Sequence, residues 1–109
     1  VQIELSEGCN LYCGFCGLQG IREKKAKNFR FMDVKTLESL VKQMVALKWN
    51  PRVEFAMHGE PTMNPHFIEM IRTVRVLAPT YHIMMTSNGG GLLKDTAKVI
   101  REMFEAGLN

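Results

Sequence analysis

VQIELSEGCNLYCGFC, residues 1–16, is the stretch that decides what this chain is predicted to build. Its first six residues alternate apolar and polar side chains, which is typical of a β-strand with one buried face. All the cysteines of the chain follow within eight residues, at Cys9, Cys13 and Cys16. A chain that clusters its only thiols directly after a strand is predicted to hold a metal there.

The number of cysteines narrows the kind of metal site. Each protein thiolate holds one iron of an iron–sulfur cluster, so three thiolates leave one iron of a four-iron cluster open to a substrate or cofactor. Two alternatives stay open: a zinc site completed by His58, His66 or His82, and a dithiol switch at the C-x-x-C pair. Gly17 and Gly20 follow that pair and disfavour the helix that a thioredoxin-like motif should open.

Composition and charge exclude several classes of protein. The chain has 109 residues, 46% of them hydrophobic, and a net charge of +3, as an ordinary globular protein does. No apolar run is long enough for a transmembrane helix, and the first residues do not have the pattern of a secretory signal, since Glu4 and Glu7 interrupt them. An odd number of clustered cysteines suits a reducing compartment. We therefore expect a cytoplasmic protein with no membrane partner.

A basic stretch between residues 22 and 30 is the main charged feature. It contains Arg22, Lys24, Lys25, Lys27 and Arg30. Such a loop could meet an acidic substrate or nucleic acid. No Trp or Tyr is interleaved to stack on a base, so a solvated loop is favoured and nucleic acid stays an open alternative.

The rest of the chain alternates strand and helix patterns. Strands are predicted at residues 1–6, 52–57 and 81–86. Three helices follow them, the first capped by Asp33, the second opened by Asn64-Pro65, and the third spanning residues 94–106 before a Gly107 cap. Their expected buried residues are Val34, Leu37, Val41, Met44 and Val45, then Phe67, Ile71, Val74 and Ala78, and last Ala97, Ile100 and Phe104.

Three strand–helix units in succession predict an α/β fold. We expect three successive βα units of a partial (β/α) TIM-like barrel, with a parallel sheet and the helices outside. The chain starts without Met and stops where a fourth strand is due, so we expect an excerpt from a longer barrel. The cysteine segment, residues 58–61 and residues 87–89 all follow strand ends, the edge at which such sheets carry active sites.

Strand alternation predicts the character of the barrel interior. If Val53, Phe55 and Met57 face the helices, then Glu54 and His58 face the interior, and Glu4 does so on the first strand. We therefore expect a polar inner face.

Three motifs resemble those of the radical S-adenosylmethionine (radical SAM) superfamily. The cysteine motif, with Phe15 just before its last cysteine, closely resembles the superfamily's cluster signature. Residues 59–61, GEP, resemble its Gly-Gly-Glu-Pro motif, with His58 in place of the first glycine. Residues 86–89, TSNG, are similar to a Thr-Asn-Gly pattern after the third strand. Residues 1–109 would then be the N-terminal half of a radical SAM core domain.

The resemblance implies a function. Cys9, Cys13 and Cys16 would ligate three irons of a [4Fe-4S] cluster, and the amino and carboxylate groups of SAM would chelate the fourth. An external low-potential electron donor would reduce the cluster, and cleavage of SAM would give a 5'-deoxyadenosyl radical that abstracts hydrogen from a small-molecule or peptide substrate. The alternative function is a zinc-binding Cys3His structural or interaction module.

The resemblance also implies which residues contact SAM. Phe15 would border the adenine, Gly59 would let the backbone approach closely, and Glu60 would offer its carboxylate to the ammonium group. Ser87 and Asn88 would hydrogen-bond the methionyl or ribose portion.

Overall fold

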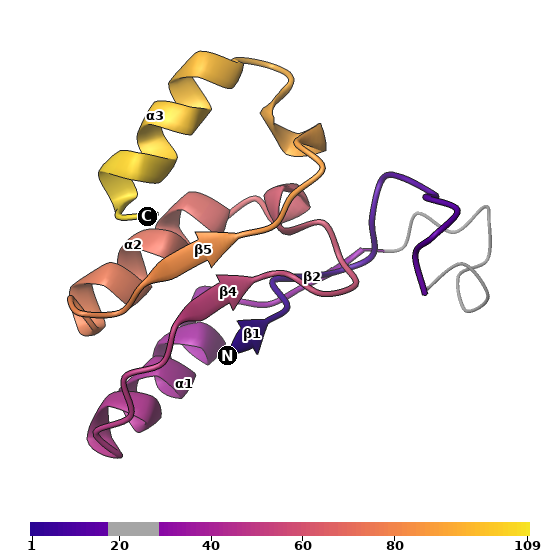
Figure 1. The fold of residues 1–109 in the computed structure, drawn as a ribbon. Helices are drawn as coiled ribbons and strands as arrows, with labels where there is room; N and C mark the ends of the chain where they lie inside the picture. Colours follow the sequence, from indigo (N-terminus) through magenta and orange to yellow (C-terminus); the bar gives the residue numbers. More distant parts are fainter. Residues whose placement is uncertain (18–28) are drawn as a thin grey trace.

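A computed structural model describes residues 1–17 and 29–109 (Figure 1). Its strands are β1 (Gln2–Ile3), β2 (Ser6–Glu7), β3 (Arg30–Phe31), β4 (Val53–Phe55) and β5 (Ile83–Met85). Its helices are α1 (Val34–Ala46), α2 (Phe67–Leu77) and α3 (Thr96–Ala106), with short 3-10 turns at Pro61–Met63 and Gly90–Leu92. None of the helices described is long and apolar enough to cross a membrane.

A parallel sheet in the order β1-β4-β5 forms the centre of the molecule. In register, Ile3 lies beside Phe55, and Phe55 lies beside Met85. The three predicted strands are confirmed, although each is shorter than its sequence pattern. Figure 1 shows β4 and β5 pointing toward the end of the sheet from which the cysteine segment extends. The three predicted motif segments therefore share one edge of the sheet.

Helix α2 buries its predicted apolar stripe, and α1 buries the central part of its own, Leu37, Val41 and Met44, while Val34 is partly buried. The Asp33 carboxylate accepts a hydrogen bond from Thr36 N at 2.8 Å and so caps α1. The core combines residues of the sheet and of both helices: Ile3, Leu5, Leu37, Val41, Met44, Val53, Phe55, Met70, Ile71, Val74 and Ile83. Val45 was predicted to be buried, which is wrong, because it is 41% exposed. It lies one helical step beyond buried Met44 and so faces solvent.

The stripe predicted for α3 is also wrong. Ala97, Ile100 and Phe104 are exposed, Phe104 by 57%, and the helix instead buries Met103 and Ala106. In the described part of the chain no strand lies beyond β5, so α3 packs beside α2 and turns a different face inward. The predicted cap is confirmed at Gly107, whose φ of +112° is a left-handed conformation.

A small antiparallel ladder between β2 and β3 was not predicted. It pairs Ser6 with Phe31 and Glu7 with Arg30, and the Arg30 guanidinium lies 2.7 Å from the Glu7 carboxylate. The ladder holds residues 6–7 beside residues 30–31. The cysteines follow directly after the first of these two strands. The other basic residues of the stretch lie outside the described residues, so the interpretation of that stretch as a solvated loop or an acidic-ligand site stays untested.

The entry to α2 differs from its prediction. The helix begins at Phe67, and His66, not Asn64, is its N-cap residue. Asn64 is completely buried, and its amide donates to Leu5 O at 2.8 Å and to Met32 O at 3.0 Å. Asn64 therefore ties the chain before α2 to the first strand region and to the end of the β2–β3 ladder.

The sheet face away from the helices is polar, as predicted. Glu54 accepts hydrogen bonds from Thr86 Oγ1 at 2.9 Å and from Gln2 Nε2 at 3.3 Å. These two bonds, first that from Thr86 and then that from Gln2, lower the pKa of the Glu54 carboxyl. Met57 does not face the helices as predicted, since it is 52% exposed with a φ of +109°. The strand has already ended before this residue.

Candidate functional site

Three loops meet at the carboxyl edge of the sheet. They are the cysteine loop (residues 8–17), the β4 loop (residues 56–64) and the β5 loop (residues 86–92). Glu60 N donates to Gly8 O at 2.9 Å, and Asn88 Nδ2 donates to Asn10 Oδ1 at 3.0 Å. The sequence motifs that were predicted to converge are thus joined directly to one another.

The candidate metal ligands of the cysteine loop are its three thiols. Cys9, Cys13 and Cys16 are each partly buried, and none forms a disulfide. Cys16 N donates to Cys13 O at 3.0 Å, which closes a turn, and Leu11 N donates to Cys9 Sγ at 3.5 Å. This donor set fits an iron–sulfur cluster with one open iron. Within residues 1–17 and 29–109 no three His, Cys, Asp or Glu side chains form a ready metal centre, so the loop would draw its sulfurs together on binding.

The zinc alternative needs a histidine near the thiols. His82 directly precedes β5 and lies at the opposite edge of the sheet, whereas His66 Nδ1 lies 3.2 Å from Glu69 Oε2 at the start of α2. His58 is in the β4 loop, with Nδ1 3.7 Å from Glu4 Oε1. The described residues therefore assemble no Cys3His site.

Glu60 is a buried charged group of the β4 loop, with 2% of its surface exposed. Its Oε1 accepts hydrogen bonds from Thr62 N at 3.0 Å, from Thr62 Oγ1 and from Ser87 Oγ. Its Oε2 accepts from Asn88 N at 2.7 Å. One buried carboxylate thus fixes the β5 loop against the β4 loop, with four donors to satisfy its charge.

Gly59 is required by a close approach of two backbones. A Cβ atom at this position would lie 1.5 Å from Ser6 O and 3.1 Å from Gly8 O. Only glycine leaves room for the β4 loop to pack on the chain that leads into the cysteine loop. The close contact predicted for Gly59 therefore includes the protein's own backbone.

The glycines of the β5 loop are closely packed against the two neighbouring loops. Gly90–Leu92 forms a 3-10 turn. A Cβ on Gly90 would lie 2.0 Å from Asn10 Nδ2, and one on Gly91 would lie 2.2 Å from Thr62 O. Gly91 N also donates to Thr62 Oγ1 at 3.0 Å. The small residues let the β5 loop contact both neighbouring loops.

Glu4 has a role that alternation alone did not reveal. Its Oε1 accepts hydrogen bonds from His58 N at 2.8 Å and from Gly59 N at 2.9 Å. It therefore holds the first turn of the β4 loop in addition to lying on the polar face. Two further supporting residues, Thr62 and Asn10, were not predicted from the sequence. The one available signal was that Thr62 directly follows the GEP motif.

Phe15 lies at the outer part of the cysteine loop and is 94% exposed. A ring this exposed loses solvent contact only when another molecule or chain segment covers it. The contact to adenine that the motif implies for this ring stays a prediction.

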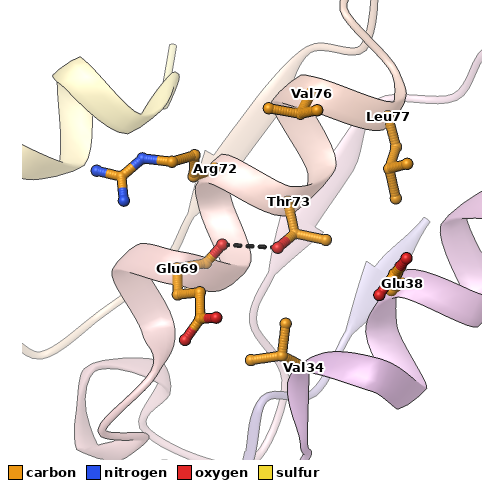
Figure 2. A pocket seen from close by; sticks show the side chains of 7 residues that line it. All are labelled: Val34, Glu38, Glu69, Arg72, Thr73, Val76 and Leu77. Atoms are coloured by element: carbon orange, nitrogen blue, oxygen red, sulfur yellow. Dashed lines mark hydrogen bonds between the residues drawn. The ribbon is translucent and has the colours of Figure 1, made fainter.

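A surface hollow elsewhere on the molecule contains none of these residues. The hollow has a volume of about 460 Å³ and lies between α1 and α2. Figure 2 shows the side chains that line it and the hydrogen bond that Thr73 Oγ1 donates to Glu69 O at 2.9 Å. Its lining residues are Val34, Glu38, Glu69, Arg72, Thr73, Val76 and Leu77. The residues that line this hollow belong to α1 and α2, and none of them belongs to the three loops. We therefore place the candidate site at the loops.

Comparison with known families agrees with this geometry. Residues 3–109 match the family model of the radical SAM superfamily. The chain belongs to this superfamily. Its enzymes use a [4Fe-4S] cluster and SAM, so the family and cofactor predictions are confirmed at this level.

Individual relatives are distant and longer. The chain is 26% identical to the GTP 3',8-cyclase of Yersinia pestis over 98 residues, which cover 90% of this chain and 29% of that protein. It is 27% identical to the GTP 3',8-cyclase of Nostoc sp. over 108 residues, which cover 99% of this chain and 31% of that protein. The structure of BtrN in complex with AdoMet and 2-DOIA matches with a TM-score of 0.81 and 22% identity, covering 98% of this chain and 41% of that one. This match confirms the partial TIM-like fold.

Proposed function

We propose that this chain holds a [4Fe-4S] cluster and SAM for radical catalysis. Cys9, Cys13 and Cys16 ligate three irons, and SAM binds the fourth through its amino and carboxylate groups. The reduced cluster supplies the electron that cleaves SAM to a 5'-deoxyadenosyl radical, which abstracts hydrogen from the substrate. The direct joining of the cysteine loop to the β4 and β5 loops carries this proposal.

The residues around the thiols have different roles in holding the cofactor. Glu60 holds the β4 and β5 loops in one arrangement, which fixes the backbone and side chains that face the cofactor. Gly59 and Ser87 line this junction, and Phe15 offers an apolar ring for the adenine. The Glu60 carboxylate already accepts four protein hydrogen bonds, which leaves at most part of one oxygen for the SAM ammonium.

We infer that the substrate is a small molecule and that an external low-potential protein supplies the electron. The curated relatives are named for GTP, and the BtrN structure contains 2-DOIA. The chain spans 29–31% of the two cyclases described above, so neither GTP nor 2-DOIA is assigned to it as a substrate.

Electron paramagnetic resonance of the anaerobically reconstituted and reduced protein, with and without SAM, tests this function. We expect a four-iron signal that changes when SAM is added, together with formation of 5'-deoxyadenosine. A four-iron signal that is indifferent to SAM would overturn the SAM assignment. One tightly held zinc in place of a cluster would support the structural module.

Three single variants, Cys9→Ser, Cys13→Ser and Cys16→Ser, provide the internal control. If all three thiols ligate iron, each variant loses the SAM-responsive signal. A dithiol switch requires Cys13 and Cys16 alone and binds no cluster, so it predicts no four-iron signal in the wild type and a reversible Cys13–Cys16 disulfide that Cys9→Ser leaves intact.

A further inference from the structure

The side-chain amide of Asn88 points at a predicted cluster ligand. Its Nδ2 lies 3.3 Å from Cys9 Sγ and 3.0 Å from Asn10 Oδ1. Its Oδ1 accepts from Gly90 N at 2.7 Å. Because a backbone N–H can only donate, this last bond places the oxygen toward Gly90 and the NH2 group toward Cys9. Both amide hydrogens are then used, one on the sulfur and one on Asn10.

The backbone of Asn88 is held as firmly as its side chain. Asn88 N donates to the buried Glu60 carboxylate at 2.7 Å, and the preceding Ser87 Oγ donates to the same group. The close packing of Gly90 on Asn10 holds the amide from the other side. The donor therefore stays in place when the thiol becomes a thiolate, which can only accept hydrogen bonds.

We propose that Asn88 is a positioning residue that raises the reduction potential of the cluster by donating a hydrogen bond to Cys9 Sγ. The proposal rests on the function proposed above. Reduction adds one electron to the cluster and its sulfurs, so an N–H dipole aimed at a ligand sulfur stabilises the reduced form more than the oxidised form. Three cysteines supply the protein ligands, so Asn88 is not needed for assembly.

This role differs from the contact between Asn88 and SAM that the motif implies. A contact to SAM acts only when SAM is bound, whereas a hydrogen bond to Cys9 acts on the cluster alone. A potential measured without SAM therefore reports the second role and not the first.

A redox titration of the reconstituted protein without SAM, poised with dithionite and mediators and followed by electron paramagnetic resonance, tests the proposal. Asn88→Ser removes the donor to Cys9, and we expect the equilibrium constant for one-electron reduction to fall by up to about tenfold, or ~59 mV. Asn88→Asp can still accept from Gly90 N but places a carboxylate beside the thiolate, so its fall should be larger.

Asn50→Asp is the matched control. Asn50 accepts a hydrogen bond from Thr80 at the opposite end of the sheet, and its substitution adds the same charge as Asn88→Asp. Its potential should equal that of the wild type. A fall as large as that of Asn88→Asp would show that net charge, not the hydrogen bond, sets the potential.

The remaining outcomes separate this inference from the proposed function. Wild-type potentials in both Asn88 variants would overturn the inference and leave SAM cleavage by the wild-type protein intact. Failure of both variants to assemble the cluster would also overturn it, because a residue that only adjusts the potential is not required for assembly. A wild-type protein without a four-iron cluster would overturn the proposed function, and this inference with it.

Discussion

The β4 and β5 loops and the cysteine loop share one edge of the sheet but are held in opposite ways. The first two are fixed internally, with Glu60 2% and Thr62 5% exposed and every oxygen of the Glu60 carboxylate bonded to the protein. The cysteine loop instead exposes 94% of Phe15 and keeps its thiols partly open. We call the β4 and β5 loops together the platform, because the protein's own hydrogen bonds hold them in place. The cysteine loop is the ligand loop, which a bound group would complete.

The largest expected effect comes from adding a methyl group at Gly59, which lies in the part of the edge that the protein holds fixed. Gly59→Ala places a Cβ 1.5 Å from Ser6 O, a backbone atom that cannot move without shifting the strand region. We expect the free energy of unfolding to fall by at least about 3 kcal/mol in urea denaturation.

Gly14→Ala is its control in the cysteine loop. Among the described residues, a Cβ on Gly14 meets no atom within 4 Å apart from its own chain neighbours, so stability should change by less than about 0.5 kcal/mol. Equal losses in the two variants would contradict the division into a fixed platform and an open ligand loop.

The Glu60 carboxylate provides the next largest effect. Glu60→Gln keeps the size of the side chain but turns one acceptor into a donor that faces the N–H or O–H donors of the β4 and β5 loops. We expect a loss of about 2 kcal/mol in the free energy of unfolding. Glu105→Gln, on the exposed side of α3, should lose nothing measurable. Should both variants unfold like the wild type, the four bonds to Glu60 do not stabilise the platform.

Substitution of Phe15 should weaken SAM binding and leave stability unchanged. Phe15→Ala removes an exposed ring, so stability should stay within about 0.5 kcal/mol of the wild type. If the ring borders adenine, SAM should bind about tenfold more weakly in equilibrium binding to the reconstituted protein. Phe104→Ala, which removes a ring 57% exposed on α3, should change neither quantity. Unchanged SAM affinity in Phe15→Ala would remove this residue from the proposed site.

Local patterns in the sequence predicted the sheet, the helices and the edge that carries the motifs. Leu37 and Val41 were found to be buried because a helical period records one face directly. Ile100 was misplaced because the same period does not say which neighbouring element a helix will meet. Patterning indicates that a buried stripe exists, and tertiary packing decides its direction.

Sequence patterns could not predict the hydrogen bonds that join the loops of the site. Glu60 and Asn88 were identified as motif residues, but their bond joins loops separated by a whole helix and strand. Asn64 was interpreted through its neighbour Pro65 as the cap of α2. Its Oδ1 does accept a local hydrogen bond from His66 N at 2.9 Å, but the helix begins only at Phe67, and the Asn64 NH2 group bonds two distant carbonyls. Alternation placed Glu4 on the correct face without identifying its partners. Such contacts depend on chain segments that meet only in the fold.

The smallest expected effect concerns the polar face beside the platform. Hydrogen bonds from Thr86 and then Gln2 lower the pKa of Glu54 from its ordinary value of 4.5. A carboxyl whose pKa is lowered by folding contributes stability above the ordinary value and loses it as pH falls through the lowered one. The wild type should therefore lose more stability in acid than Glu54→Gln, measured as thermal midpoints from neutral pH down through this window. Glu105→Gln should follow the wild type, and parallel curves for wild type and Glu54→Gln would mean that Gln2 and Thr86 do not hold this carboxylate in solution.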